Sequence, residues 1–133
     1  MDTKDCRLKV REIWDSLAIP AGRIIKYQGS WPEVQLEIFE GKKYDEVDLN
    51  VSAHDCFALN YFIPEATFYY LGSYLIFTNK WAEDVTNGIK FVFWDERIFH
   101  TLNILEAEIA RLQPDDPVKK TLAEIHAFFT AFT

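Results

Sequence analysis

Residues 57–77 read FALNYFIPEATFYYLGSYLIF and form the most apolar stretch of this 133-residue chain. The stretch is long enough to cross a bilayer, but Pro64 and Glu65 interrupt it and Asn60 precedes them, so it divides into two buried helices. Pro64 suits the first turn of a helix, where its missing N–H costs nothing, and Glu65 complements the positive end of the helix dipole. We therefore expect a helix that begins at Pro64 and extends to about residue 80.

The expected helix 64–80 is apolar on two adjacent faces. Its large side chains recur at helical spacing, with Phe68, Leu71 and Leu75 on one face and Tyr70, Tyr74, Phe77 and Trp81 on the other. Such a helix belongs at the centre of a domain, because exposing either face would forfeit roughly 1.5–3 kcal/mol per large side chain. Gly72 and Ser73, on the remaining side, would let another backbone come close.

The rest of the chain predicts helices that surround this one. We expect a helix over 3–17 capped by Asp2 or Thr3, one from Ser30 that Gly41 terminates, and one from Ser52 to Asn60. Residues 98–112 and 118–132 repeat one apolar spacing on either side of a short proline-containing connection, which predicts an antiparallel helical hairpin. Residues 83–88 predict a turn, and residues 23–27 and 89–94 are candidates for a minor two-stranded β element.

These expectations add up to a mainly α fold in a single domain over residues 1–133. The predicted architecture is a compact bundle of five or six helices around a buried central helix at about 64–80, with the hairpin at the C-terminal end. A chain of 133 residues is long enough for one domain with a substantial core. Apolar residues make up 49% and aromatic residues 16% of it, which excludes an intrinsically disordered chain.

Charge and cysteine usage restrict the partners and the compartment. The formal net charge of −7 argues against nucleic acids and anionic membranes and favours a basic protein partner. Cys6 and Cys56 both fall within apolar-periodic segments, so we expect both thiols to be reduced and buried. The first residues are charged and lack the apolar core of a signal peptide, so we expect a cytoplasmic protein.

The segment from Pro64 to Leu75 reads PEATFYYLGSYL and resembles the PEA-x-x-YYL-x-x-YL signature of a family of small bacterial proteins of unknown function. The similarity continues more faintly through Phe39-Glu40-Gly41-Lys42 and Tyr44 to the helix near Ser52, about half of the chain in all. The signature implies no activity and brings no catalytic residues. Some families of this kind occur among bacterial toxin-neutralising proteins, so the resemblance implies a role in toxin neutralisation.

The sequence contains no constellation that favours catalysis. Its five glycines are scattered singly, which excludes a glycine-rich phosphate loop. His54, Asp55 and Cys56 adjoin, but successive helical positions point about 100° apart and cannot converge on one metal ion. We therefore predict no catalytic residue, no cofactor and no metal site.

Three hypotheses for function follow. The first is a non-catalytic protein-binding domain, an immunity protein that occludes a basic toxin, whose acids surround exposed aromatic residues. The second is a small enzyme or ligand-binding domain with a pocket beside the central helix, and the third is a homodimerisation module built on the hairpin. The candidate partner-binding residues are Trp31, Glu37, Glu40, Tyr44, Asp45, Glu46 and Asp48, and those of the alternative pocket are Glu65, Tyr69 and His126.

Overall fold

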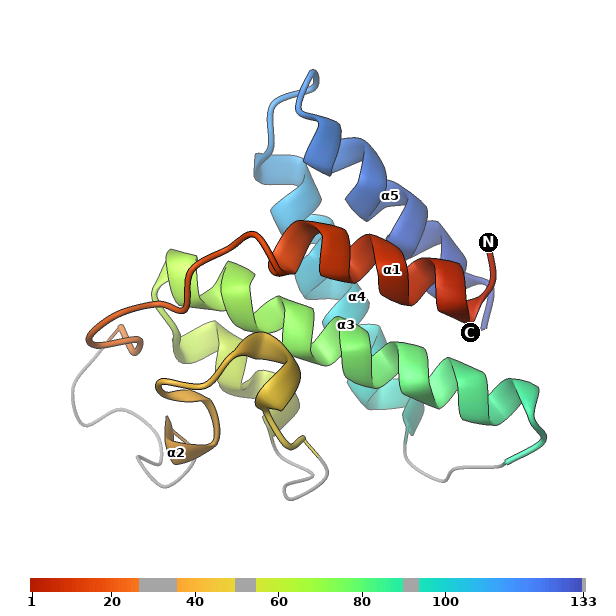
Figure 1. Cartoon of the computed structure of the whole chain (residues 1–133), viewed down its shortest axis with the longest axis horizontal. Helices are drawn as coiled ribbons and strands as arrows, with labels where there is room; N and C mark the ends of the chain where they lie inside the picture. Colours follow the sequence, from red (N-terminus) through yellow and green to blue (C-terminus); the bar gives the residue numbers. More distant parts are fainter. Residues whose placement is uncertain (27–35, 50–54, 90–93, 133) are drawn as a thin grey trace.

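The computed structural model describes residues 1–26, 36–49, 55–89 and 94–132 (Figure 1). The described residues form five α-helices, two short 3-10 helices and no β-strand, which confirms the predicted mainly α class. In chain order the elements are α1 (Thr3–Trp14), α2 (Leu36–Phe39), η2 (Tyr44–Glu46), η3 (Asp55–Tyr61), α3 (Pro64–Thr86), α4 (Trp94–Arg111) and α5 (Pro117–Thr130). In Figure 1, α3 runs through the molecule, with α1 packed along one side of it.

Helix α1 begins with a capping box. The Asp2 carboxylate accepts a hydrogen bond from the Asp5 backbone N–H at 2.8 Å, and the Asp5 carboxylate accepts one from the Asp2 N–H at 3.3 Å. Cys6, Val10 and Trp14 recur every four residues and are fully buried, so they form the face that packs inward. The helix ends at Trp14, three residues before the predicted end at Leu17.

Helix α3 is longer than the sequence predicted. Residues up to Thr86 are helical, so the turn expected over 83–88 is wrong for its first four residues. Only Asn87 and Gly88 leave the helix, and Gly88 adopts a φ of +84°, the left-handed conformation that ends many helices. The polar composition of these residues reflects the solvent exposure of the last helical turn and not a break in the helix.

A tryptophan of α1 occupies the glycine notch on α3. A Cβ atom placed on Gly72 would lie 2.5 Å from the Trp14 ring, so Gly72 admits an indole and not, as expected, a neighbouring backbone. The Trp14 Nε1–H donates to the Phe68 carbonyl at 3.1 Å, and the two rings stack with centroids 5.2 Å apart. This contact fixes α1 against the first half of α3.

Helices α4 and α5 lie side by side and both contact α3 (Figure 1). The connection between them ends at Asp116, whose carboxylate accepts the Val118 backbone N–H at 2.9 Å and so caps α5. Pro117 occupies the first turn, as the sequence predicted. The side chains of Leu105, Leu122, Ile125 and Phe129 are fully buried in this part of the core.

The short segments before α3 are tied to one another through the backbone. Ile25 pairs with Phe62 in a single antiparallel bridge, and the Lys26 N–H donates to the Tyr61 carbonyl at 2.8 Å. The partner expected for residues 23–27 was 89–94, of which 90–93 lie outside the described residues, and the expectation is wrong for Trp94, which begins α4. The helices predicted from Ser30 and Ser52 are described only over α2 and η3, and Gly41 follows α2 with a φ of +74°.

Two further findings concern the Cys6 thiol and the character of the helices. Cys6 is a free thiol and fully buried, and that burial raises the pKa of its thiol to about 12. Among the described helices, none combines the length and the apolar character that a membrane-spanning segment requires.

Candidate functional site

The last two turns of α1 separate two regions of opposite character. A helix advances 100° per residue, so Arg11 and Asp15 share one face while Glu12 and Ser16 share another. Arg11 and Asp15 contact η2 and its neighbours, whereas Glu12 and Ser16 line an open groove. The buried stripe that ends at Trp14 lies against α3 between these two regions.

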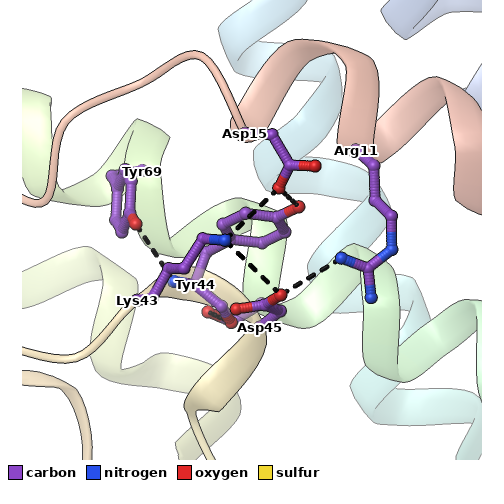
Figure 2. A network of polar contacts seen from close by, with 7 residues as sticks. Arg11, Asp15, Lys43, Tyr44, Asp45 and Tyr69 are labelled. Carbon is purple, nitrogen blue, oxygen red and sulfur yellow. Dashed lines mark hydrogen bonds and ion pairs between the residues drawn. The ribbon is translucent and has the colours of Figure 1, made fainter.

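The first region is a polar network around Tyr44, shown in Figure 2. The Tyr44 side chain is fully buried, and its hydroxyl donates to the Asp15 carboxylate at 2.5 Å. Its backbone N–H donates to the Tyr69 hydroxyl at 3.1 Å, and its carbonyl accepts from the Ser73 hydroxyl at 2.6 Å. Burial, together with the adjacent Asp15 carboxylate, raises the pKa of Tyr44. Tyr44 therefore joins η2 to both α1 and α3.

Asp45 belongs to the same network through charge (Figure 2). Its Oδ2 lies 3.1 Å from the Arg11 guanidinium and 3.9 Å from the Lys43 Nζ, and Lys43 also lies 3.7 Å from Asp15. The Asp45 Oδ1 is buried and has no hydrogen-bond partner among the described residues. We call Arg11, Asp15, Lys43, Tyr44, Asp45 and Tyr69 the η2 network.

A second tyrosine of α3 holds the chain just before η2. The single hydrogen of the Tyr70 hydroxyl is shared between the Phe39 carbonyl at 2.6 Å and the Lys42 carbonyl at 3.0 Å. The Phe39 ring meets Tyr70 edge-on, with centroids 5.3 Å apart. Burial raises the pKa of Tyr70 to about 12. Together with the η2 network, these contacts fix residues 39–45 against α3.

The structure separates the predicted partner-binding residues into two groups. Glu37, Glu40, Glu46 and Asp48 are exposed, and we call them the acidic surface. The prediction that Tyr44 is an exposed aromatic is wrong, because its ring fills the space between α1 and α3. The Asp45 side chain is only 21% exposed because it is ion-paired within the chain. Trp31 lies outside the described residues.

The three residues of the alternative pocket are not brought together by any contact described here. Glu65 is exposed in the first turn of α3, while Tyr69, one turn later, is buried and accepts a hydrogen bond from the Tyr44 N–H. His126 lies on α5 with its Nε2 3.9 Å from the Glu106 carboxylate. None of the three lines the groove, so the structure gives them no shared chemistry there.

The second region is the α1–α5 groove, which has a volume of about 430 Å³. Its walls come from the end of α1, from α3, from the connection between α4 and α5, and from the start of α5, and are lined by Glu12, Ile13, Ser16, Leu17, Phe68, Leu112, Asp116, Pro117, Val118 and Thr121. Our sequence reasoning missed this site because four separate segments form it. The one available signal was the spacing of Ile13 and Leu17, which continues an apolar row past the end of α1.

The basic residues of α1 are largely matched by acids from other elements. Arg7 lies 3.7 Å from Glu83 at the end of α3, and Lys9 lies 3.0 Å from Glu124 on α5. Arg11 pairs with Asp45, as described above. These three bases therefore do not form a cationic face on α1.

Comparison of the chain with protein-family models, with curated proteins and with solved structures found no match. The resemblance of residues 64–75 to a bacterial family thus stays a prediction. Within the described ranges, no group of three or more His, Cys, Asp or Glu side chains is placed to hold a metal ion.

Proposed function

We propose that this chain is a non-catalytic protein-binding domain that engages a basic protein partner through the acidic surface. The observation that carries the proposal is the separation within residues 37–48. Glu37, Glu40, Glu46 and Asp48 remain exposed, while Tyr44 and Asp45 between them are anchored to α1 and α3. The acids are thus presented on a backbone that is already fixed.

A fixed acidic surface suits recognition of a cationic partner in two ways. Ordering a loop on binding costs conformational entropy, and the buried contacts of Tyr44 and Tyr70 place most of that cost in folding. Several like charges on one surface steer an oppositely charged protein and raise its association rate, an effect that salt screens. The chain carries a formal net charge of −7, which extends this attraction beyond the contact itself.

The finer form of the proposal is a cytoplasmic immunity protein that occludes a basic toxin. The resemblance of residues 64–75 to a family associated with toxin neutralisation supports this form. In the proposed scaffold, α3 is the central helix of the bundle and α4 and α5 form an antiparallel hairpin beside it. Contacts with α3 and the end of α1 hold residues 39–45 in place.

The test reverses charge at two exposed acids of the acidic surface. The partner to measure is the basic protein encoded by the neighbouring reading frame or, failing that, a basic protein captured by the tagged chain from its native host. We expect Glu40→Lys with Glu46→Lys to slow association at low salt by about tenfold or more, with a smaller effect at high salt.

The matched control is Asp84→Lys with Glu106→Lys, which changes the net charge equally at the end of α3 and on α4. We expect this control to slow association by no more than about twofold. The attraction between two charges weakens as their separation grows, and these two positions lie outside the proposed contact. Equal association rates for the two double variants would remove the acidic surface as the binding site. Absence of any basic partner would remove the function itself.

A further inference from the structure

We infer that the α1–α5 groove binds an apolar helical segment with a cationic edge, carried by the protein partner. The inference rests on the proposed function, because it assigns to that partner a second and chemically different contact. The groove is separate from the acidic surface, since it lies on the Glu12 side of α1 and the η2 network lies on the Arg11 side.

The floor of the groove is apolar and already formed. Leu17 remains 38% exposed at its edge, although it continues the apolar row of α1 past the end of the helix. Phe68 is held in place by stacking on Trp14, so the groove needs no rearrangement of this ring before binding. Leu112 and Val118 supply apolar surface from the other side. Covering such surface contributes roughly 25 cal/mol of favourable free energy for each Å² of apolar area removed from water.

The charged residues that line the groove determine which occupant suits it. Glu12 comes from α1 and Asp116, which also caps α5, comes from the connection into that helix. Lys119 is not among the residues that line the groove, and its Nζ donates to the Leu112 carbonyl at 3.2 Å. Two carboxylates beside an apolar floor favour lysine or arginine next to apolar side chains. The same carboxylates disfavour a nucleic acid, an anionic lipid or an acidic peptide.

Size and surroundings favour a helix as the occupant. A cavity of roughly 150 Å³ accommodates one benzene-sized group, so a groove of about 430 Å³ has room for more than one apolar side chain. The groove is walled by helices, and the residues that line it include no β-strand to which an extended peptide could add. An amphipathic helix that places residues i, i+3 or i+4, and i+7 in an apolar groove is the recognition mode that suits these walls.

The experiment uses a synthetic amphipathic helix of about 14 residues as its probe, with leucines at the helical spacing above and lysines along both flanks. A matched peptide carries glutamate in place of every lysine. Binding to the full chain is followed by backbone amide chemical shifts and by fluorescence anisotropy. We expect the lysine peptide to shift Leu17, Val118 and Thr121 and to bind at least about tenfold more tightly than the glutamate peptide.

Two leucines of the N-terminal segment provide a matched pair of variants. Leu17→Lys removes apolar surface from the groove and adds a charge that repels the lysines of the peptide. We therefore expect it to lower the affinity for the lysine peptide by about tenfold or more. Leu8→Lys makes the same change at a side chain that is 57% exposed and does not line the groove, and we expect less than a twofold effect. Both positions are exposed, so circular dichroism should show both variants folded.

The outcomes separate this inference from the proposed function. The inference is overturned if the lysine peptide fails to bind, if it binds no better than the glutamate peptide, or if both leucine variants lower its affinity equally. This holds whether or not the full partner binds. If the chain is a dimer by light scattering and Leu17→Lys alone makes it monomeric, a second copy occupies the groove and the inference is also overturned. The variant with Glu40→Lys and Glu46→Lys should lose the full partner yet retain the peptide within about twofold, because the groove is local.

Discussion

The two sides of the last turns of α1 differ in how completely the rest of the chain covers them. On the Arg11 side, η2 packs against the helix and pairs Asp15, Tyr44 and Asp45 within the chain. On the Glu12 side, Ile13 is only partly buried against the core and Leu17 is exposed, and a groove remains. The same helix therefore presents a residue that contacts the rest of the chain, Arg11, and next to it a residue that lines an open groove, Glu12.

Neighbouring acids in residues 45–46 show the same contrast at smaller scale. Asp45 and Glu46 are equivalent in charge, yet Asp45 is ion-paired to Arg11 while Glu46 faces solvent. What sets their roles is the element packed against each of them. A partner can use Glu46 directly, whereas use of Asp45 would require breaking contacts that hold η2 in place.

The largest expected effect is that of Trp14→Ala, because Trp14 supports both sides. Its ring is fully buried, stacks on Phe68 at the floor of the groove and precedes Asp15 of the η2 network. Truncating a buried tryptophan to alanine costs about 3–5 kcal/mol. We expect urea unfolding to show a loss of this size, a large part of the stability of an ordinary domain. Leu8→Ala, on the exposed face of α1, should stay within about 0.5 kcal/mol, and similar losses for both would contradict the assignment.

Gly72→Ala should have the next largest effect. Alanine favours a helix over glycine by about 1 kcal/mol, but its Cβ would meet the Trp14 ring at 2.5 Å. Overpacking of this kind costs about 1–3 kcal/mol, so we expect a net loss in the free energy of unfolding. The same substitution in a Trp14→Phe background should cost less, because the smaller ring leaves room. A gain in stability from Gly72→Ala alone would show that the indole moves aside freely.

Much of the fold was accessible from the sequence because it depends on local signals. The helix start at Pro64, the Asp2 cap and the apolar row of α5 are set by residues close together in the chain, and the structure has each of them. The end of α3 was misjudged because polar residues on an exposed last turn resemble those of a loop. Gly88 was the residue that ended the helix, and four polar positions before it obscured that signal.

The candidate site was less predictable because it depends on contacts between distant segments. Tyr44 meets Asp15 across 29 residues and Ser73 across another 29, so nothing near it in the sequence indicates burial. An aromatic residue in a polar, acidic segment looks exposed until α1 and α3 close over it. The groove has the same origin, since Leu17 and Val118 meet only in the folded chain.

A smaller effect should distinguish hydroxyl groups on the two sides of α1. Tyr44→Phe removes the hydrogen bond to the Asp15 carboxylate while it keeps the buried ring, and we expect a loss of about 1.5 kcal/mol in the free energy of unfolding. Thr121→Val changes a residue that lines the groove and removes a hydroxyl that donates to the Pro117 backbone carbonyl at 3.3 Å, a long hydrogen bond. We expect this second loss to stay within about 0.5 kcal/mol. Equal losses would mean that the Tyr44 hydroxyl in the η2 network contributes no more to stability than the Thr121 hydroxyl in the groove.

The smallest effect at neutral pH is the titration of the buried tyrosines, which becomes visible only in alkali. Burial raises the pKa of Tyr70 from its ordinary value of 10.0 to about 12, and burial raises that of Tyr44 as well. Between these values the unfolded chain has lost a proton that the folded chain retains, so the unfolded state binds fewer protons and stability falls as pH rises. The stabilisation that comes from the raised tyrosine pKa is complete below pH 10 and is lost as the pH rises through the pKa of the folded state.

Urea midpoints should therefore fall above about pH 10, and the fall should be shallower in Tyr70→Phe. The part of the tyrosinate absorbance that Tyr70→Phe removes should appear only together with unfolding, because the buried hydroxyl keeps its proton in the folded chain. If that part of the signal appears near pH 10 while the chain stays folded, solvent reaches the Tyr70 hydroxyl.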